Sequence, residues 1–273
     1  MNDNVYRLIR DTAVSAAKCA GSLQKQRFQK NVEIFSDSHN DITTMVDREC
    51  SDIIASHIGS VFPDHSILCE EASYVSGGSE YEWVIDPLDG SVNYFLGLPY
   101  YCVSIACYHK SAAMEAGGDG RNSVFGVVYA PSTDELFTGS ETEGAYYNGK
   151  RIIVSKSRRL GEGILGLSLG SKAEIFSAVH AFLPAVFEEA KKVRSLGATA
   201  LDLCRVAAGG LTGLFQIGVK LWDFAAARII LECAGGCFDS REDAPGCYTI
   251  IAGNKASMPE MEVLFRWKTG VMS

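Results

Sequence analysis

Hydrophobic positions recur along the chain with two different periods, which predict helices and strands in mixed order. Between Val5 and Leu23, apolar or small side chains recur every three or four residues, the spacing of one face of an amphipathic helix. The same spacing continues from Val46 to a stop at Pro63, with Thr43 or Thr44 as the expected N-cap. Further helices are predicted at Ala173–Lys191, Ala200–Ala208, Asp223–Ala234 and about Met258–Trp267.

Short apolar runs bounded by turn residues predict strands between these helices. Asn148-Gly149 is a two-residue hairpin signal, and the Gly-rich segment Ser111–Asn122 is expected to be a loop. This mixture of helices and strands predicts an α/β fold, a layered sandwich with a mixed sheet. One domain is expected over 1–273. The charged stretch Lys156–Arg159 divides it into subregions of about 1–155 and 156–273. The predicted strands are Asn31–Phe35, Ser66–Cys69, Trp83–Ile85, Tyr101–Tyr108, Phe125–Tyr129, Glu135–Thr138, Gly144–Tyr147, Arg151–Ser155, Ile164–Leu169, Val193–Leu196, Leu211–Ile217 and Thr249–Ala252.

Composition narrows the classes of function. The net charge of -8 argues against non-specific binding to nucleic acid or anionic membranes, so a phosphate ligand would need a local device such as a metal. No apolar run approaches the roughly 20 residues of a membrane span, and no signal-peptide layout is expected at the N-terminus. The nine cysteines form no C-x-x-C pair, which favours reduced thiols and a cytoplasmic location. Six are expected in apolar surroundings: Cys19, Cys50, Cys102, Cys107, Cys204 and Cys233.

The most informative stretch places two acids at the end of a predicted buried strand. Asp86 and Asp89 are three positions apart, and Pro87 between them favours a sharp turn. Gly90 allows close approach of a ligand, and Ser91 has the chemistry of a helix N-cap. Such a turn can bind a hard cation through its carboxylates and a phosphate through its N–H groups. The alternative is an ordinary acidic turn that caps a helix.

Other acids lie at the ends of further predicted elements. Glu70 and Glu71 follow a strand, Asp47 lies in the first turns of a helix, and Asp223 starts an Ala-rich helix. Alone, Asp47 is explained by the helix dipole, Asp223 by an N-cap role and the glutamates by a solvated loop. Together with Asp86 they form a set of oxygen ligands without Cys or His, which points to a hard metal such as Mg²⁺.

Two motif matches are rejected on their context. Gly161–Gly166 fits G-x-G-x-x-G, but it follows a charged run and precedes a strand-like run, the reverse of a dinucleotide site. Gly166–Gly170 fits the nucleophile-elbow pattern around Ser168. The His that follows is His180, and Glu174, which lies between them, is too close along the chain to complete a convincing triad.

These residues resemble the inositol monophosphatase family, in its bacterial inositol-1-monophosphatase type. Trp83–Asn93 is similar to the first signature of that family, and Trp222–Ala226 with Glu232–Gly236 is similar to the second. The resemblance implies an αβαβα sandwich of the sugar phosphatase (fructose-1,6-bisphosphatase/inositol monophosphatase) type. It also implies a Mg²⁺-dependent, lithium-sensitive phosphomonoesterase that is usually a homodimer. Further matching segments are Asp41–Asp47, Glu70-Glu71, Gly126–Tyr129 and Gly144–Lys150.

The resemblance also assigns roles to individual residues. Two or three Mg²⁺ ions would be held by Glu70, Asp86, the Leu88 carbonyl, Asp89 and Asp223. The N–H groups of Gly90 and Ser91 would bind phosphate. The implied catalytic residues, which would orient the attacking water, are Glu70, Ser91, Asp47 and Thr44. The residues expected to face the substrate are Asp89, Gly197, Ala198, Thr199, Gln216 and Asp223.

Two positions depart from the family pattern. The family often has a Lys a few residues before the segment that starts at Asp41, whereas no Lys lies between Asn31 and Asp47. Gln216 stands where inositol-selective members commonly have Glu; it keeps one acceptor oxygen but loses the charge. The sequence therefore predicts altered inositol selectivity with the hydrolytic centre intact.

The resemblance leaves alternatives for the function. The first is hydrolysis of inositol monophosphate or a related sugar or polyol phosphate. The same chemistry on fructose 1,6-bisphosphate or a 3′-phosphonucleotide is the second. A third follows from bacterial relatives that act as partners of the transcription and ribosome-assembly machinery without needing catalysis. Direct binding to nucleic acid or to membranes is not expected.

Overall fold

The computed structural model describes residues 2–30, 33–38, 41–110, 121–157, 159–168 and 176–265. Within these ranges the strands form a seven-stranded sheet, a five-stranded sheet and a two-stranded hairpin. The hairpin pairs β1 (Ile34–Ser38) with β2 (Asp41–Thr44) in antiparallel fashion, just before the helix that begins at Met45.

The seven-stranded sheet contains the strands between residues 66 and 151. It is mixed, because β3 runs parallel to β4 while the remaining neighbours are antiparallel. In spatial order its strands are β3 (Ser66–Cys69), β4 (Tyr81–Asp89), β5 (Cys102–Lys110), β6 (Arg121–Ala130), β7 (Glu135–Ser140), β8 (Gly144–Tyr147) and β9 (Lys150–Arg151).

The five-stranded sheet is built from the later part of the chain. Strand β10 runs parallel to both of its neighbours, β11 and β12. Strand β14 runs antiparallel to both of its neighbours, β12 and β13. In spatial order the strands are β11 (Lys192–Arg194), β10 (Ile164–Ser168), β12 (Gly213–Val219), β14 (Cys247–Asn254) and β13 (Gly236–Ala244).

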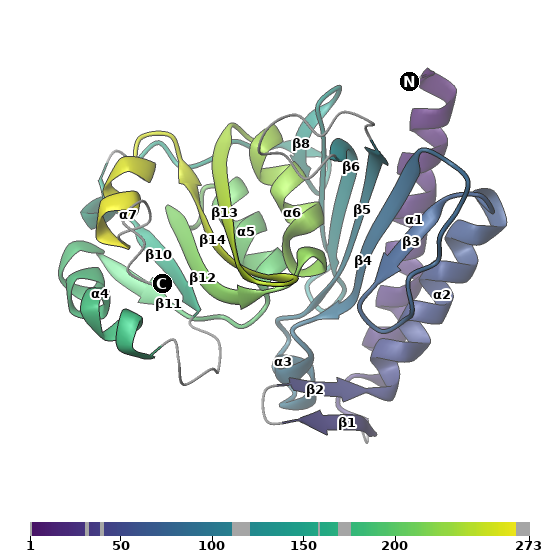
Figure 1. Ribbon diagram of the computed structural model, residues 1–273, viewed down its shortest axis with the longest axis horizontal. Helices are drawn as coiled ribbons and strands as arrows, with labels where there is room; N and C mark the ends of the chain where they lie inside the picture. The colour runs from purple at the N-terminus through teal and green to yellow at the C-terminus, as the bar shows by residue number, and fades with distance from the viewer. Residues whose placement is uncertain are drawn as a thin grey trace.

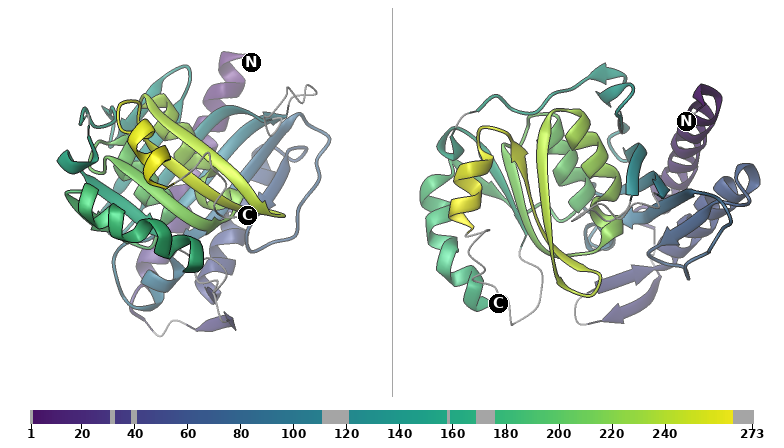
Figure 2. Two further views of the ribbon diagram at one scale, coloured as in Figure 1. Left: turned by 60° about the vertical axis from the view of Figure 1, so that its left-hand side comes forward. Right: turned by 45° about the horizontal axis from the view of Figure 1, so that its top comes forward.

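Helices separate and cover the two sheets, so that five layers alternate (Figures 1 and 2). The first two helices cover the outer face of the seven-stranded sheet, α5 and α6 lie between the sheets, and α4 and α7 cover the outer face of the five-stranded sheet. The predicted αβαβα sandwich with mixed sheets is confirmed. The helices are α1 (Asp3–Arg27), α2 (Met45–Val61), α3 (Ser91–Phe95), α4 (Phe176–Glu189), α5 (Thr199–Ala207), α6 (Leu221–Cys233) and α7 (Met258–Leu264).

The alternation of side chains along β4 shows how one strand serves two cores. Trp83 and Ile85 are fully buried against α1 and α2, whereas Val84 belongs to the core shared with α5 and α6. Side chains two positions apart point to the same face of a sheet, so Glu82 and Asp86 face the same side as Val84. The strand therefore directs Asp86 into the middle layer, which contains α6.

Several predicted elements differ from the structure at particular points. The predicted strand Arg151–Ser155 is wrong beyond Arg151, because Val154 leaves the sheet and donates its N–H to the carbonyl of Ala234 at the end of α6 (3.2 Å). Of the predicted loop 111–122, residues 111–120 lie outside the described residues, and Arg121 and Asn122 belong to β6. Strand β13 was not predicted.

The cysteines and helices agree with most of the expectations from composition. All nine cysteines are free, and Cys50, Cys102, Cys107 and Cys204 are buried as predicted. Cys19 is exposed, because it lies on the solvent side of α1, so its predicted apolar surroundings are wrong. Among the described residues, no helix is both long and apolar enough to cross a membrane.

Candidate active site

The acidic turn lies at the carboxyl end of β4, where the strand pairing with β5 is interrupted. Asp86 lies opposite Ser104 and Asp89 lies opposite Cys102, so two residues of β4 face one residue of β5. This β-bulge takes Pro87 and the following residue out of the regular ladder. Ser104 and Cys102 are two positions apart on β5 and share one face of the sheet, so the bulge places Asp86 and Asp89 on that same face.

Asp86 is the electrostatic centre of the site. The residue is 2% exposed, and its carboxylate accepts a hydrogen bond from the Leu88 N–H at 3.0 Å. Burial raises the pKa of Asp86 well above its ordinary value, and nearby carboxylates raise it further. In decreasing order of effect, these neighbours are Glu70, Asp89, Asp223 and Asp47. The structure therefore brings together acids from four separate segments of the chain.

Asp89 holds the N-terminus of a helix that is distant in the sequence. Its two carboxylate oxygens accept hydrogen bonds from the Thr199 N–H (3.0 Å) and the Ala200 N–H (2.7 Å) at the start of α5. Ala198, the residue at the N-cap position, has no side chain that could do this. Burial raises the pKa of Asp89 to about 7, although these N–H groups oppose the shift. The thiol of Cys102 is a third donor, at 3.5 Å.

Asp47 connects the start of α2 to the acidic turn. It forms a capping box with Thr44, whose N–H donates to Asp47 Oδ2 at 2.9 Å and whose hydroxyl donates to the same oxygen. The other oxygen, Oδ1, accepts the Ser91 hydroxyl at 2.8 Å. Burial raises the pKa of Asp47, and the donors on Thr44 and Ser91 oppose this shift. Of the two expected N-cap candidates, Thr43 and Thr44, the structure uses Thr44, and the hydrogen bond between Ser91 and Asp47 that the resemblance implied is present.

Gly90 occupies a conformation that few other residues adopt. Its φ of 89° lies in the left-handed region, and a Cβ at this position would lie 3.0 Å from the Tyr100 carbonyl oxygen and 3.2 Å from Ala198 Cβ. Asn93 fixes the same region, since its amide donates to the carbonyls of Tyr100 (2.9 Å) and Leu196 (2.8 Å). The turn after β4 and the predicted substrate loop 197–199 are therefore in direct contact.

Gln216 reaches the same loop from the opposite sheet. Its amide donates to the Thr199 hydroxyl at 2.6 Å, while its oxygen Oε1 is buried and accepts no hydrogen bond from the described residues. Trp222, next to Asp223, has a buried indole N–H that likewise has no partner within the described ranges. Gln216 on β12 thus has an unused acceptor, and Trp222 on α6 has an unused donor. Trp222 was not among the predicted site residues.

Asp223 lies in the first turn of α6, but the N-cap role considered for it is wrong. Lys220 occupies the N-cap position, and Asp223 accepts its backbone N–H at 2.8 Å from within the helix. Glu70 directly follows β3, and its N–H donates to the Ile85 carbonyl at 3.2 Å, which places it beside the end of β4. Both residues lie at element ends that face Asp86.

The donor set at this site suits a hard cation. It consists of carboxylate and carbonyl oxygens, and the mutual repulsion of the acids is the feature that a cation would relieve. Within the described ranges, however, no three His, Cys, Asp or Glu side chains form a preassembled group that could hold a metal ion. A cation would therefore have to draw the carboxylates closer together.

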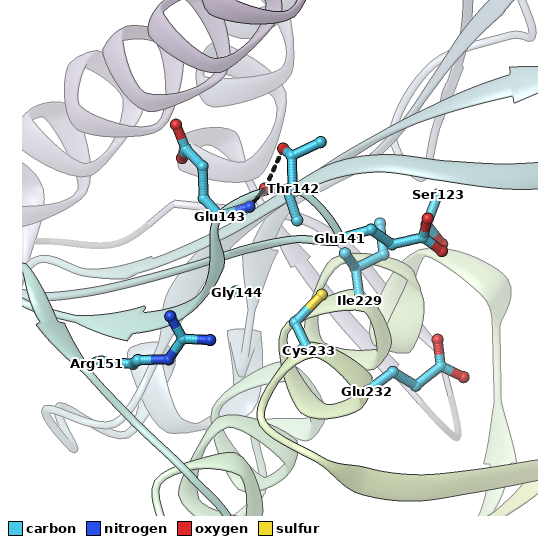
Figure 3. Close-up of a pocket in the computed structure, with 10 residues that line it drawn as sticks. Ser123, Glu141, Thr142, Glu143, Gly144, Arg151, Ile229, Glu232 and Cys233 are labelled. Carbon is cyan, nitrogen blue, oxygen red and sulfur yellow. Dashed lines mark hydrogen bonds between the residues drawn. The ribbon is translucent and has the colours of Figure 1, made fainter.

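A cavity of about 390 Å³ lies at the other end of α6 (Figure 3). Glu232 and Cys233 line it from the helix, and the other lining residues include Glu141 in the turn after β7 and Arg151 on β9. At a rise of 1.5 Å per residue, roughly 15 Å of helix separates this cavity from Asp223. None of the predicted site residues lines it.

The groups that form hydrogen bonds to the acidic turn and to the loop before α5 were not predicted from the sequence. These are the N–H groups of α5, the thiol of Cys102, the amide of Asn93 and the side chain of Gln24 on α1, which donates to the Pro87 carbonyl at 2.7 Å. Each contact joins residues in different elements, so no local pattern could reveal it. The one sequence feature that could have indicated such a contact is the polar Gln24 on the apolar face of its helix.

The five-layer fold and the acids at its strand and helix ends define a protein of the sugar phosphatase fold class. A sequence model of the inositol monophosphatase family matches residues 6–264. A fructose-1,6-bisphosphatase/inositol-1-monophosphatase of Aquifex aeolicus is 36% identical over 252 residues, which covers 90% of each chain. The Nus factor SuhB of Escherichia coli is 37% identical over 228 residues, or 82% of each chain.

Solved structures agree with these sequence matches. The extragenic suppressor protein suhB of Bartonella henselae superposes with a TM-score of 0.86 at 29% identity, covering 96% of this chain and 99% of that one. The chain belongs to the inositol monophosphatase family.

Proposed function

We propose that this protein is a Mg²⁺-dependent phosphomonoesterase that hydrolyses inositol monophosphate or a related sugar or polyol phosphate. The observation that carries the proposal is the gathering of acids around the buried Asp86, whose pKa is raised by burial and by their charges. Family membership and the relative named as a phosphatase support it. A cofactor of two or three Mg²⁺ ions, a homodimer, one domain over 1–273 and a cytoplasmic location belong to the same proposal.

The ions would be held by the acids that cluster around β4. When bound, Mg²⁺ would supply the Lewis-acid chemistry that makes water nucleophilic near neutral pH and offsets charge on the phosphate. The proposed ligands are Glu70, Asp86, the Leu88 carbonyl, Asp89 and Asp223. Their negative charge is also the reason why a phosphate would be repelled from this site without the cation.

The chain's own residues would orient the attacking water. Ser91 donates its proton to Asp47, which leaves the lone pairs of the Ser91 oxygen available to accept a hydrogen bond from water. Thr44 holds the second oxygen of Asp47 and so fixes the direction of the carboxylate. Glu70 would orient the same water from the end of β3. The hydroxyl of Ser91 also lies 2.9 Å from the Leu88 carbonyl. The residue that would orient the water is therefore next to a carbonyl that would bind Mg²⁺.

The substrate would lie between the acidic turn and the loop before α5. The N–H groups of Gly90 and Ser91 would bind its phosphate. The segment Gly197–Thr199 and Gln216 would face the alcohol part, together with Asp89 and Asp223. The unpartnered oxygen of Gln216 is an acceptor for one hydroxyl group of a polyol.

The test is phosphate release across a substrate panel, with and without Mg²⁺ and Li⁺. The panel contains inositol 1-phosphate, glycerol 2-phosphate, fructose 1,6-bisphosphate and a 3′-phosphonucleotide. Asp86→Asn is expected to abolish Mg²⁺-dependent release. The matched control is Glu82→Gln, which neutralises a buried acid four positions earlier on the same strand that is paired with Arg121. Wild-type protein that releases no phosphate from any of these esters would overturn the proposal.

A second candidate function is a non-catalytic role in the transcription machinery. It is favoured by the several relatives named Nus factor SuhB, of which the Escherichia coli protein is 37% identical. The discriminating experiment is complementation of a strain that lacks the protein by an Asp89→Asn variant without phosphatase activity. Rescue by this variant would support the binding role, and failure of rescue with normal protein levels would support catalysis.

A further inference from the structure

Gln24 is a buried polar residue near the end of α1 that contacts the acidic turn from behind. Its side chain is fully buried, and its amide nitrogen donates to the Pro87 carbonyl at 2.7 Å. The backbone carbonyl of the same residue accepts the Tyr94 hydroxyl at 2.8 Å. Since Tyr94 belongs to α3, one residue of α1 is bonded to both sides of the segment that carries Asp89 and Ser91.

The β-bulge explains why this contact matters. Pro87 and Leu88 are the bulged residues, so their carbonyls are not held by the regular ladder with β5. The Pro87 carbonyl and the Leu88 N–H belong to one planar peptide group. The bond from Gln24 to this carbonyl therefore also fixes the Leu88 N–H, which donates to Asp86 at 3.0 Å. The carbonyl of Leu88 follows directly after this peptide group and lies 2.9 Å from the Ser91 hydroxyl.

The chemistry of Gln24 argues against a simple core-filling role. The amide oxygen Oε1 is buried and has no hydrogen-bond partner in the part of the chain that the structure describes, which is unfavourable for folding. An apolar side chain of the same length would avoid this cost but could not donate to Pro87. The contact can be assigned without ambiguity, because only the amide nitrogen can donate to a carbonyl oxygen.

We propose that Gln24 is a positioning residue that orients the Leu88 carbonyl and the adjacent Asp89 for cation binding. The inference rests on the proposed function, since it presumes that the acids around Asp86 bind Mg²⁺. Loss of the amide would let the Pro87–Leu88 peptide rotate, so that the carbonyl of Leu88 would no longer be held toward the acids. The resulting defect is in metal affinity rather than in contacts with the substrate.

The experiment measures Mg²⁺ binding directly, by titration calorimetry of metal-free protein with magnesium chloride alone. Gln24→Met keeps the length of the side chain and removes the donor. Substitutions behind metal ligands typically weaken metal affinity by about tenfold or more, and we expect this effect here. In steady-state assays at saturating Mg²⁺, the KM for the phosphate ester is expected to stay at the wild-type value.

The matched control is Tyr6→Phe. Tyr6 also lies on α1 and forms a buried hydrogen bond to the same sheet, 2.6 Å from Ser140 Oγ, but far from the acids along the helix. It is expected to lower Tm without changing Mg²⁺ affinity. If Gln24→Met does not fold, Tyr94→Phe replaces it, with a smaller weakening of Mg²⁺ affinity expected.

The outcomes separate the inference from the function on which it rests. Wild-type protein that binds no Mg²⁺ would overturn the proposed cofactor and the inference with it. Wild-type protein that binds Mg²⁺, with equal affinity in folded Gln24→Met, would overturn the inference alone. Equal weakening in Tyr6→Phe and Gln24→Met would also overturn it, because the effect would then follow from general destabilisation.

Discussion

The ion pair between Glu135 and Arg205 anchors the helix that Asp89 holds at its other end. Arg205 lies in the last turn of α5 and donates two hydrogen bonds, both 2.6 Å long, to the carboxylate of Glu135 at the start of β7. Tyr147 and Thr133 donate to the same carboxylate at 2.7 and 2.6 Å. The side chain of Glu135 is only 10% exposed, so solvent screens the pair weakly.

Burial by itself would raise the pKa of Glu135, but the donors, chiefly Arg205, lower it from 4.5 to about 2. Such a shift means that folding favours the ionised carboxylate by about 3 kcal/mol. Gln resembles the protonated acid in shape and charge, so Glu135→Gln is expected to lower the unfolding free energy by about 3 kcal/mol at neutral pH. Because the folded-state pKa is the lower one, this stabilisation is complete above the unfolded pKa and is lost as the pH falls toward 2. About 1.4 kcal/mol is expected to remain near pH 3.

Urea unfolding followed by tryptophan fluorescence, for wild type and variant at pH 7 and pH 3, measures both values. The control is Glu232→Gln, which removes an exposed pair with Arg228 one helical turn away. Exposed pairs of this type contribute less than about 0.5 kcal/mol. A loss in Glu135→Gln that is below about 1 kcal/mol at pH 7, or that is the same at both pH values, would refute the reasoning.

Three further substitutions test the site. Gly90→Ala is expected to lose at least about 1 kcal/mol of stability and most activity. The reason is that φ at this position is 89° and the new Cβ would contact the Tyr100 carbonyl oxygen. A variant with wild-type Tm and activity would contradict this prediction. Ser91→Ala removes the hydroxyl bonded to Asp47 and should lower kcat by about 100-fold, with a fall below about tenfold counting against the role. Gln216→Glu should raise the kcat/KM ratio of inositol 1-phosphate to glycerol 2-phosphate, and an unchanged ratio would show that this residue does not set selectivity.

Local sequence predicted the parts of the site that form within one turn. The capping box of Thr44 and Asp47 joins residues three positions apart, and the hairpin at Asn148-Gly149 needs only two residues with positive φ. Both arise from contacts that a short segment can make by itself. The acidic turn is of the same kind, since Asp86, Pro87 and Asp89 are adjacent in sequence.

Strand β13 shows where the pattern of hydrophobic positions failed. Its sequence from Gly236 to Ala244 is rich in charged residues, and most of its side chains are exposed or half-buried. It is nevertheless a strand, because it lies at the edge of its sheet and pairs with β14 from Gly236 opposite Asn254 to Ala244 opposite Cys247. Charged residues are common in edge strands, where they discourage pairing with other chains.

The sequence by itself determined the alternation of helices and strands, the layered fold class and the residues with oxygen ligands, because these depend on periodicity and side-chain chemistry. Only the tertiary structure decided which groups hold those ligands. Asp89 bonds to the N-terminus of α5, 110 residues away, and the Pro87 carbonyl bonds to Gln24, 63 residues away. Such contacts depend on how the layers pack against one another, and the packing of whole layers is not encoded in any single segment.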